Sequence, residues 1–423
     1  MQSNEKSSRD LRQEQCVKTW LKSKGKGCIV ASTGFGKSRV GCMIISKILS
    51  KYPDKNVLIV VPTTLLKEQW EHLIDSYGYS LSCSIQVINT VIKNVYTCDL
   101  LIIDEIQRVS ADTFKEVFNT VNYKYVLGLT ATFERLDGKH KLIEQYCPIC
   151  DNIPITECLI NGWVSPYKIY QVLIDVDDIE TYKRYNKEFT EHFEFFGYDF
   201  NLALSLLGPK GFINRAKLRD ERCPHGTEEQ RKAMFTSITY HATAFMRCIQ
   251  ARKAFINNHP KKIELARKII DNRVGSKIVT FSNNVKMAEA IKRGNVYTGK
   301  TSKKKGRTTI EQFNTQQEGV LCTCFKADEG MDIKGLSVGI VLGTNSSEIK
   351  ATQRIGRICR FEEGKQAEMF YLIINNSVEC EWFKKANIKQ NYITINEEGL
   401  DAVLRGEEPP PYTKPIQNFT FRF

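Results

Sequence analysis

Short apolar runs alternate along this chain with longer segments in which apolar residues recur every three or four positions. The runs that predict buried strands in the first half are residues 27–30, 57–61, 84–88, 99–103 and 125–129. Helical spacing follows them, most clearly in residues 40–49. Regular alternation of strands and helices is typical of an α/β domain built on a parallel sheet.

The same alternation returns in the second half, where residues 277–281, 295–297 and 319–323 predict strands. Residues 177–272 differ from both halves, because their spacing is helical, strands are scarce and basic side chains are frequent. A chain of 423 residues is too long for a single core. We therefore predict an α/β protein with two parallel sheets and a mostly helical insertion.

The composition indicates where in the cell the protein works and which partners its charge attracts. No stretch approaches roughly 18 uninterrupted apolar residues, and residues 1–25 are mostly polar, so we expect neither a membrane span nor a secretory signal. The fourteen cysteines fall mostly in apolar segments and indicate reduced core residues in a cytoplasmic protein. The net charge of +13 attracts polyanions, although charge alone identifies no partner.

Residues 31–38, Ala-Ser-Thr-Gly-Phe-Gly-Lys-Ser, stand between a predicted strand and a predicted helix. The positions expected to hold a nucleotide are Thr33, Gly34, Gly36, Lys37 and Ser38. The glycines let the backbone bend so that its N–H groups point at phosphate oxygens, next to the positive end of the helix. The lysine can reach the outer phosphates and the serine can bind Mg²⁺. The segment predicts a P-loop for ATP, and its alternative is a glycine-rich turn.

Two adjacent carboxylates, Asp104 and Glu105, follow the apolar run 99–103, roughly seventy residues beyond the P-loop. At the end of a buried strand they have a natural division of labour. Asp104 is placed to hold Mg²⁺, and Glu105 is placed to orient the attacking water. The alternative is an acidic pair on the solvated surface.

Hydroxyl-bearing residues follow other predicted strands. Thr63 and Thr64 come after residues 57–61, and Thr90 follows the next strand. Such hydroxyls are suited to a phosphate backbone, while Thr63 could equally cap a helix. Upstream of the P-loop, Gln15 carries an amide that suits an adenine edge, or it is a surface glutamine.

Three segments in this order resemble motifs I, II and III of superfamily 2 helicases, and the third is similar to the XPB-like branch. They are residues 31–38, residues 104–107 (Asp-Glu-Ile-Gln) and residues 129–138 (Leu-Thr-Ala-Thr-Phe-Glu-Arg-Leu-Asp-Gly). The resemblance implies that Thr130 and Thr132 couple the nucleotide state to the grip on nucleic acid. Motif II often ends in His, and Gln107 departs from that pattern, which puts its contact across the cleft in doubt.

Further segments extend the resemblance from about Leu11 to Tyr371. They are residues 11–15 (Q motif, with Glu14 in place of the usual aromatic), 62–66 (motif Ia), 160–166 (the crossing between domains), 324–332 (motif V) and 353–360 (motif VI). The resemblance implies two RecA-like domains. The expected division is a first domain at 1–150, a linker and first strand of the second domain at 151–176, the insertion at 177–272, the second domain at 273–395 and a tail at 396–423.

The second half supplies the other expected site residues. They are Gln353, Arg357 and Arg360 for catalysis, Gly330 and Asp332 for the nucleotide, and Thr298, Gly299, Lys300 and Thr323 for nucleic acid. Arg357 and Arg360 share one helix face, so both guanidinium groups can meet the charge on a γ-phosphate. The run from Lys300 to Arg307 predicts a basic loop that contacts phosphates, or a solvated charge run.

Two further patterns allow competing interpretations. Aromatic residues gather between Phe193 and Phe200, where they stack on bases or separate strands, or form the insertion's own core. Cys147 and Cys150, with Cys158 further on and Cys223 beyond, have the spacing of part of a zinc knuckle. The core interpretation and the absence of zinc are favoured in these two cases.

Together these patterns predict an ATP- and Mg²⁺-dependent helicase or translocase, a monomer without a membrane anchor. The resemblance favours DNA over RNA and looks like compact phage or viral enzymes of replication and recombination that act on forked or branched DNA in a host cytoplasm. The alternatives are an RNA helicase, a duplex-DNA switch ATPase and the motor subunit of a restriction nuclease.

Overall fold

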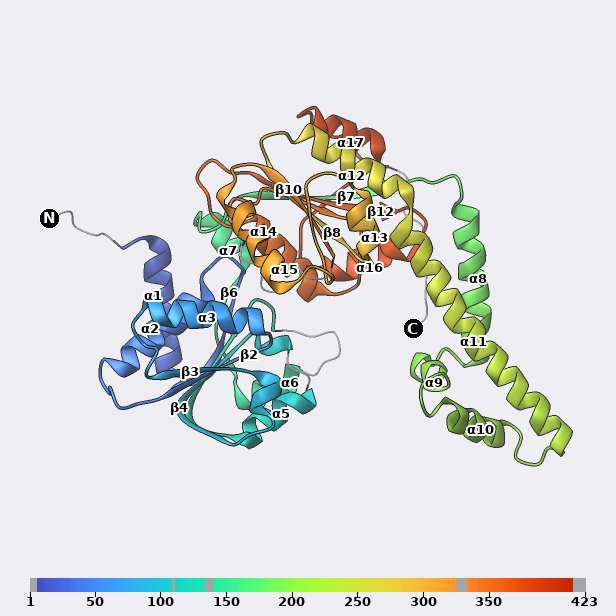
Figure 1. Ribbon diagram of the computed structural model, residues 1–423, viewed down its shortest axis with the longest axis horizontal. Coiled ribbons are helices and arrows are strands. Elements are labelled where there is room, and N and C mark those ends of the chain that lie inside the picture. The colour runs from blue at the N-terminus through green and yellow to red at the C-terminus, as the bar shows by residue number, and fades with distance from the viewer. Residues whose placement is uncertain (1–5, 109–110, 134–139, 325–332, 414–423) are drawn as a thin grey trace.

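The computed structural model describes residues 6–108, 111–133, 140–324 and 333–413. Two sheet domains lie one above the other, and a group of helices projects from the upper one (Figure 1). The predicted α/β class with two parallel sheets is confirmed. No helix in these described ranges is long and apolar enough to cross a membrane.

The first sheet has six strands in the order β3-β2-β4-β5-β1-β6, and its pairings are parallel. Its strands are β1 (Lys26–Ala31), β2 (Val57–Val61), β3 (Cys83–Val87), β4 (Tyr96–Asp104), β5 (Val121–Thr130) and β6 (Ile149–Ile153). All five residues of β2 are buried, which accounts for its uninterrupted apolar run. The first domain therefore continues past residue 150 and includes β6.

Helices cover both faces of the first sheet. They are α1 (Ser8–Lys22), α2 (Lys37–Leu49), α3 (Thr64–Ser76), α4 (Ile88–Val91), η1 (Ile106–Arg108), α5 (Ala111–Thr120), α6 (His140–Tyr146) and α7 (Ile155–Ile160). Trp20 of α1 and Trp70 of α3 pack in the core on one face. Ile88 of α4 and Val117 of α5 pack in the core on the other face. This gives the three-layer arrangement expected for alternating strands and helices.

The second sheet has seven strands in the order β13-β7-β12-β11-β8-β10-β9. They are β7 (Tyr167–Ile174), β8 (Lys277–Ser282), β9 (Asn295–Tyr297), β10 (Gly319–Cys324), β11 (Val338–Val341), β12 (Ala367–Ile374) and β13 (Ile393–Ile395). The helices on its faces are α12 (Pro260–Asn272), α13 (Val285–Ala290), α14 (Lys303–Thr315), α15 (Glu348–Ile358), α16 (Val378–Ala386) and α17 (Glu397–Leu404). Leu400 and Val403 of α17 are buried in this core, so the second domain extends into the segment predicted as a tail.

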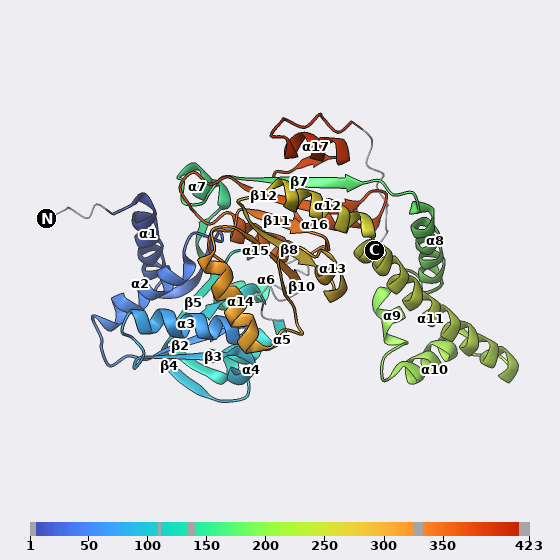
Figure 2. The same ribbon diagram turned by 45° about the horizontal axis from the view of Figure 1, so that its top comes forward.

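The projecting part, which we call the arm, consists of residues 179–258 between β7 and α12. Its helices are α8 (Ile179–Phe195), α9 (Phe200–Ser205), α10 (Gly211–Arg222) and α11 (Glu228–Asn258). In both views the arm extends away from the two sheets, and α11 is its longest helix (Figures 1 and 2). Helix α12 packs on the second sheet through Leu265 and Ile269, so only part of the predicted insertion projects.

Part of the aromatic cluster of the insertion forms the core of the arm, whereas Tyr198 and Phe200 are exposed. Phe193 and Phe196 are 3% and 2% exposed. The ring of Phe193 lies 5.3 Å from that of Phe245 on α11, in a stacked arrangement. These aromatics hold α8 and α9 against α11, and the core interpretation of the pattern agrees with their burial.

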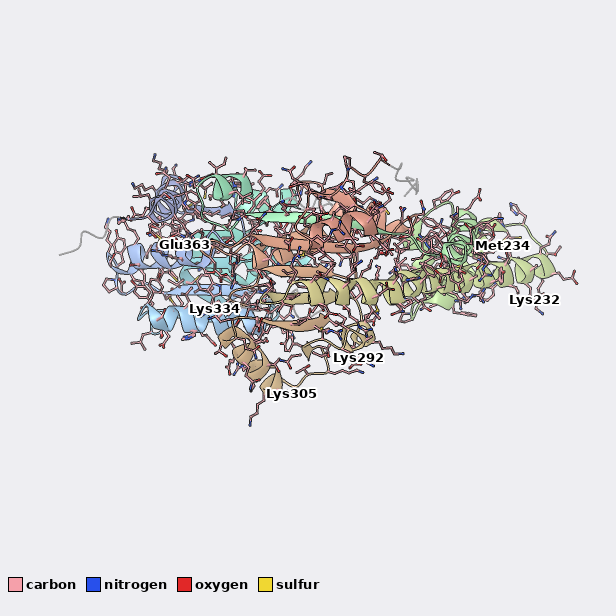
Figure 3. The ribbon with its side chains drawn as sticks, turned by 90° about the horizontal axis from the view of Figure 1, so that it is seen from above. Lys232, Met234, Lys292, Lys305, Lys334 and Glu363 are labelled. Carbon is pink, nitrogen blue, oxygen red and sulfur yellow. The ribbon has the colours of Figure 1, made fainter. Side chains whose placement is uncertain are left out.

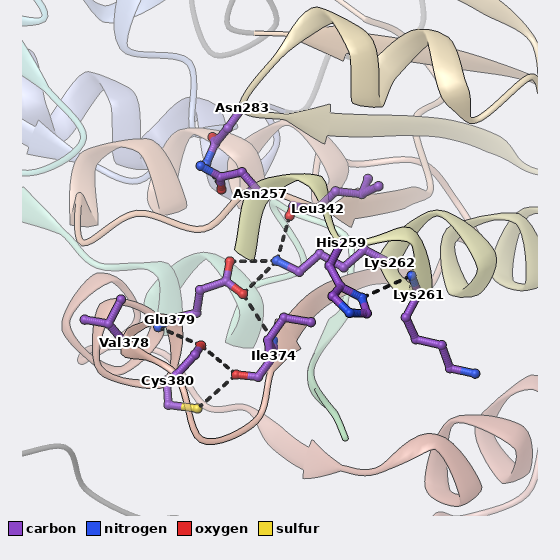
Figure 4. A network of polar contacts seen from close by, with 12 residues as sticks. Asn257, His259, Lys261, Lys262, Asn283, Leu342, Ile374, Val378, Glu379 and Cys380 are labelled. Atoms are coloured by element: carbon purple, nitrogen blue, oxygen red, sulfur yellow. Dashed lines mark hydrogen bonds and ion pairs between the residues drawn. The ribbon is translucent and has the colours of Figure 1, made fainter. Parts of the chain in front are cut away.

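A buried ion pair fastens α12, at the root of the arm, to the second domain (Figure 4). The Lys262 Nζ lies 2.7 Å from both carboxylate oxygens of Glu379 and 3.0 Å from the Leu342 carbonyl oxygen. The Ile374 N–H donates to the same carboxylate at 3.1 Å. Burial lowers the pKa of Lys262 and raises that of Glu379, while the attraction between them opposes both shifts.

We expect Lys262→Met to lower the free energy of unfolding by about 3–5 kcal/mol, because it leaves the Glu379 carboxylate buried without its cation. Lys268→Met on the same helix is the matched control, since Lys268 and Asp401 form a partly exposed pair. That control should cost less than about 1 kcal/mol. Urea unfolding of the two variants measures the difference, and equal losses would contradict the assignment.

Candidate nucleotide site and nucleic-acid face

A cavity of about 480 Å³ lies between the two domains. The first domain contributes three residues of α1 and α3, which are Arg9, Leu66 and Gln69, and the motif II carboxylates Asp104 and Glu105. Its P-loop contributes Thr33, Gly34, Gly36, Lys37 and Ser38. The second domain contributes Gln353, Gly356, Arg357, Arg360 and Phe361. The structure thus brings the P-loop, the carboxylates and the arginines into one site.

The P-loop has the left-handed backbone that its glycines allow. Gly34 and Gly36 have φ angles of 90° and 99°, in a region that side chains disfavour. Lys37 is the first residue of α2, and its Nζ donates to the Ala31 carbonyl oxygen at 3.1 Å. The N-terminus of α2 therefore opens on the cavity with a cation beside it, which suits a phosphate chain.

Asp104 is the last residue of β4 and is 5% exposed. The Trp70 indole N–H donates to its carboxylate at 2.8 Å. Burial and the neighbouring Glu105 carboxylate raise the pKa of Asp104 to about 6. Glu105 itself has a φ of 51°, a left-handed conformation that is uncommon for a residue with a side chain.

Gln107 joins motif II to motif III within the first domain. Its amide nitrogen donates to Glu105 at 2.5 Å, and the Thr130 hydroxyl donates to its amide oxygen at 2.5 Å. The Thr132 N–H donates to the Thr130 hydroxyl at 3.1 Å. A chain of hydrogen bonds therefore connects the Glu105 carboxylate with both motif III threonines.

The second domain closes the other side of the cavity. Helix α15 carries Gln353 and Arg357, and the Arg357 side chain is buried. Helix α15 ends at Ile358, so the prediction that Arg360 shares a helix face with Arg357 is wrong. Burial lowers the pKa of Arg360. A Cβ atom at Gly356 would lie 1.7 Å from the Thr33 hydroxyl oxygen, so α15 packs directly against the P-loop and tolerates no side chain there.

The crossing segment holds the two domains together beside the cavity. Val164 pairs with Arg360 in an isolated antiparallel bridge. The Ser165 N–H donates to the Cys359 carbonyl oxygen at 2.9 Å. The rings of Phe35 and Trp163 lie 5.6 Å apart, so the P-loop also contacts this segment.

Of the two glutamines near the start of α1, Gln13 and not Gln15 reaches the P-loop. Gln15 is exposed and does not line the cavity. Gln13 is buried, and its amide donates to the Phe35 carbonyl oxygen at 2.8 Å. Arg9, one helical turn earlier, donates to the same carbonyl at 3.0 Å and lines the cavity. The signal for Arg9 and Gln13 was their spacing of four, which puts them on the buried face with Val17.

The expected nucleic-acid residues differ in their exposure to solvent. Thr64, Thr90, Gly299 and Lys300 are exposed. Thr298 and Thr323 are buried, and the Thr323 hydroxyl donates to the Thr280 carbonyl oxygen at 2.6 Å. The burial of these two threonines argues against a contact with phosphates. The Thr63 hydroxyl accepts from the Leu66 N–H at 3.3 Å and caps α3.

The predicted basic loop is partly a helix. Ser302 caps α14, which begins at Lys303, so most of the basic run forms the first turns of this helix. Lys305 extends from the edge of the molecule (Figure 3). Arg307 pairs at 2.5 Å with Glu68 of α3 in the first domain.

Some expected residues are outside this description. Gly330 and Asp332 lie outside the described residues.

Among the described residues, no group of three or more His, Cys, Asp or Glu side chains could hold a metal ion. Cys147 and Cys158 are buried in two different cores. For Mg²⁺, the Ser38 hydroxyl and the Asp104 carboxylate both face the cavity, and oxygen donors of this kind fit that ion.

Two family models match the chain. The model described as type III restriction enzyme, res subunit, matches residues 7–95 and 92–135. The model described as helicase conserved C-terminal domain matches residues 261–362. The first covers most of the sheet domain with the P-loop, and the second covers the part of the second domain that carries the arginines.

Curated relatives cover most of the chain. The DNA 3'-5' translocase XPB2 of Sulfurisphaera tokodaii is 28% identical over 389 residues, which are 87% of this chain and 82% of that protein. Putative helicase 22 of a Sulfolobus islandicus filamentous virus is 23% identical over 427 residues, 92% of this chain and 67% of that protein.

Solved structures show the same fold at low identity. The Hef helicase domain of Pyrococcus furiosus covers 88% of this chain and 97% of its own, with a TM-score of 0.50 and 17% identity. Dbp5 of S. cerevisiae bound to RNA and ADP BeF3 covers 96% and 93%, with a TM-score of 0.59 and 11% identity. The chain therefore has the fold of tandem RecA-like helicase domains, its second half matches a helicase C-terminal domain, and it is similar to superfamily 2 helicases of the XPB-like branch.

Proposed function

We propose that this helicase hydrolyses ATP between its two domains and uses the cycle to move along or remodel DNA. The observation that carries the proposal is the single cavity in which Lys37, Asp104 and Glu105 of one domain face Arg357 and Arg360 of the other. Phosphoryl transfer needs little covalent chemistry from the protein, so positioning and charge in such a cleft supply most of the catalysis.

Each residue has a distinct role in the proposed reaction. The α2 N-terminus and Lys37 hold the β- and γ-phosphates, and Ser38 and Asp104 hold the Mg²⁺ that neutralises their charge. Glu105 orients the attacking water. Arg357 and Arg360 stabilise the charge that develops on the transferred group.

Coupling to movement follows from the hydrogen bonds of Gln107. Because Gln107 bonds both Glu105 and Thr130, a shift of the carboxylate on hydrolysis also shifts the motif III turn. Opening of the domains after hydrolysis would then move the two sheet edges that bind nucleic acid, one on each domain, relative to each other. Thr64 and Thr90 lie on one of these edges, and Gly299 and Lys300 lie on the other.

DNA is the substrate we favour, because the XPB2 relative is named a DNA translocase and aligns along most of this chain. Forked or branched DNA is the form we propose. An RNA substrate is the second candidate, and the RNA in the Dbp5 structure is bound by the same fold. ATP turnover measured with single-stranded, duplex, forked and four-way DNA and with RNA tests the proposal. Stimulation by RNA alone would reverse the assignment.

Binding to DNA is expected to weaken steeply with salt and to depend little on base sequence, because exposed lysines and hydroxyls contact phosphates. Lys300→Ala should reduce the slope of log affinity against log salt by about one. Lys47→Ala is the control, since Lys47 is also exposed, on α2, and lies outside the proposed contacts. Fluorescence anisotropy over a salt series measures both slopes, and an unchanged slope in Lys300→Ala would exclude that contact.

A further inference from the structure

Trp70 of α3 is a core side chain that reaches the edge of the nucleotide cavity from behind. It is 2% exposed and packs among the apolar residues of the first domain. A buried indole N–H needs a hydrogen-bond acceptor, and here that acceptor is the Asp104 carboxylate at 2.8 Å. Trp70 is outside the lining of the cavity, whereas Asp104 belongs to it. The side chain thus contacts, from the core, a carboxylate that faces the ligand space.

Each oxygen of the Asp104 carboxylate accepts one hydrogen bond from the first domain. The Trp70 indole N–H bonds Oδ2, and the Glu105 backbone N–H donates to Oδ1 at 2.9 Å. One donor on each oxygen fixes the plane of the carboxylate group. An ionised carboxylate has about four acceptor positions, so these two bonds leave positions that can bind a cation. The arrangement suits a carboxylate that is held in place for a metal.

The far edge of the same indole packs on the P-loop helix α2. A Cβ atom at Gly41 would lie 2.9 Å from the Trp70 Cη2 atom. Because nonbonded carbon atoms are usually separated by about 3.5 Å or more, the ring rests directly on the α2 backbone. Gly41 comes three residues after Ser38, about one helical turn along α2. One side chain therefore spans from the helix that carries Ser38 to the strand end that carries Asp104.

Trp20 shows the bonding of an ordinary core tryptophan in this domain. It is 1% exposed, packs in the same core and donates its indole N–H to the Val126 carbonyl oxygen at 3.0 Å. Val126 lies within β5 and outside the cavity lining. The two tryptophans therefore match in burial and in having a bonded N–H, and they differ in the acceptor. Of the two acceptors, the one bonded by Trp70 is a residue that fits Mg²⁺.

We propose that Trp70 is a positioning residue for Mg²⁺: its N–H orients the Asp104 carboxylate, and its ring keeps Ser38 of α2 at a fixed distance from that carboxylate. The inference rests on the proposed function, because it concerns the metal site of that reaction. Hydrogen-bond partners of metal ligands orient those ligands and tune the affinity for the metal. Because Trp70 is outside the cavity lining, its N–H contributes to metal binding and not to binding of the base or the phosphates.

The test measures metal binding by electron paramagnetic resonance, with Mn²⁺ as a probe that takes the same oxygen ligands as Mg²⁺. Trp70→Phe removes the N–H and keeps an aromatic ring. With the full-length chain and a non-hydrolysable ATP analogue, it should weaken Mn²⁺ binding by roughly tenfold to a hundredfold, the range for loss of a partner of a metal ligand. The affinity for the analogue in EDTA should be unchanged, and excess Mg²⁺ should recover kcat. Trp20→Phe is the matched control, because it loses the same atoms and a bonded N–H from the same core.

Gly41→Ala is an independent variant, since a helix favours alanine over glycine. The added methyl group displaces the indole, so it should weaken Mn²⁺ binding in the parent and cause no further loss in Trp70→Phe, where the Cη2 atom is absent. Unchanged Mn²⁺ affinity in a folded Trp70→Phe, equal weakening in Trp20→Phe, or weaker analogue binding in EDTA would each overturn the inference. Should Trp70→Phe not fold, parent Mn²⁺ affinity in Gly41→Ala would overturn it. Absence of metal-dependent nucleotide binding in the parent chain would instead overturn the proposed function.

Discussion

Glu105→Gln is expected to bind ATP nearly as tightly as the parent chain and to hydrolyse it at least about a hundredfold more slowly. The substitution keeps the size of the side chain and leaves Asp104 and Lys37 in place, so the phosphate and Mg²⁺ contacts survive. It removes the negative charge that orients and deprotonates the attacking water. Titration with a fluorescent ATP analogue and DNA-stimulated phosphate release measure the two quantities separately.

Lys37→Ala is the companion to this variant. It should lose both tight ATP binding and turnover, because it removes a phosphate contact and no core packing. Loss of ATP binding in Glu105→Gln, or near-normal turnover in a folded Lys37→Ala, would refute the assigned roles. Circular dichroism of both variants shows whether the fold is kept.

Arg357→Ala is expected to leave ATP affinity largely intact and to lower DNA-stimulated turnover by roughly a thousandfold, the scale of an arginine finger. The reason is geometric, since Arg357 enters the cavity from α15, whereas Lys37 and Glu105 enter it from the first domain. A cation on the second domain acts on the γ-phosphate only when the cleft is closed. Single-turnover hydrolysis with saturating DNA gives the rate of the chemical step.

Arg357→Lys is the conservative variant and should recover only part of the rate, because a point charge lacks the planar fork of a guanidinium group. Arg247→Ala, at an exposed arginine of the arm, is the control for loss of positive charge alone. Full stimulated turnover in Arg357→Ala would mean that the second domain acts only as a clamp on nucleic acid.

Much of the site was predictable because its parts are local. The P-loop and the Asp104–Glu105 pair each occupy a few consecutive residues at the end of an apolar strand, and the fold of one strand and one helix fixes their direction. The predicted apolar runs all overlap observed strands, with β3, β4 and β5 beginning one, three and four residues earlier than predicted, whereas β11 and β12 were not predicted. The order of these parts along the chain then indicated the helicase fold.

What the sequence did not reveal depends on contacts between distant residues. The choice of Gln13 over Gln15 depends on the rotation of α1, since residues two apart on a helix face different sides. Thr298 follows a predicted strand, as the exposed Thr64 does, and only the packing of the second sheet buries it. The Lys262–Glu379 pair joins residues 117 positions apart, and no local pattern connects them.

The arm leaves the second domain after β7 and returns to it at α12, so both of its ends are anchored in the same rigid body. Its long helix α11 has 31 residues, which corresponds to a length of roughly 46 Å. The arm would therefore move with the second domain as one piece if the two domains rotate about the cleft. Each 10° of rotation between the domains sweeps its far end through about 8 Å or more, from the geometry of a rod of that length. A rotation of that size in the proposed ATP cycle would move the tip of the arm by more than two base-pair steps of about 3.4 Å each.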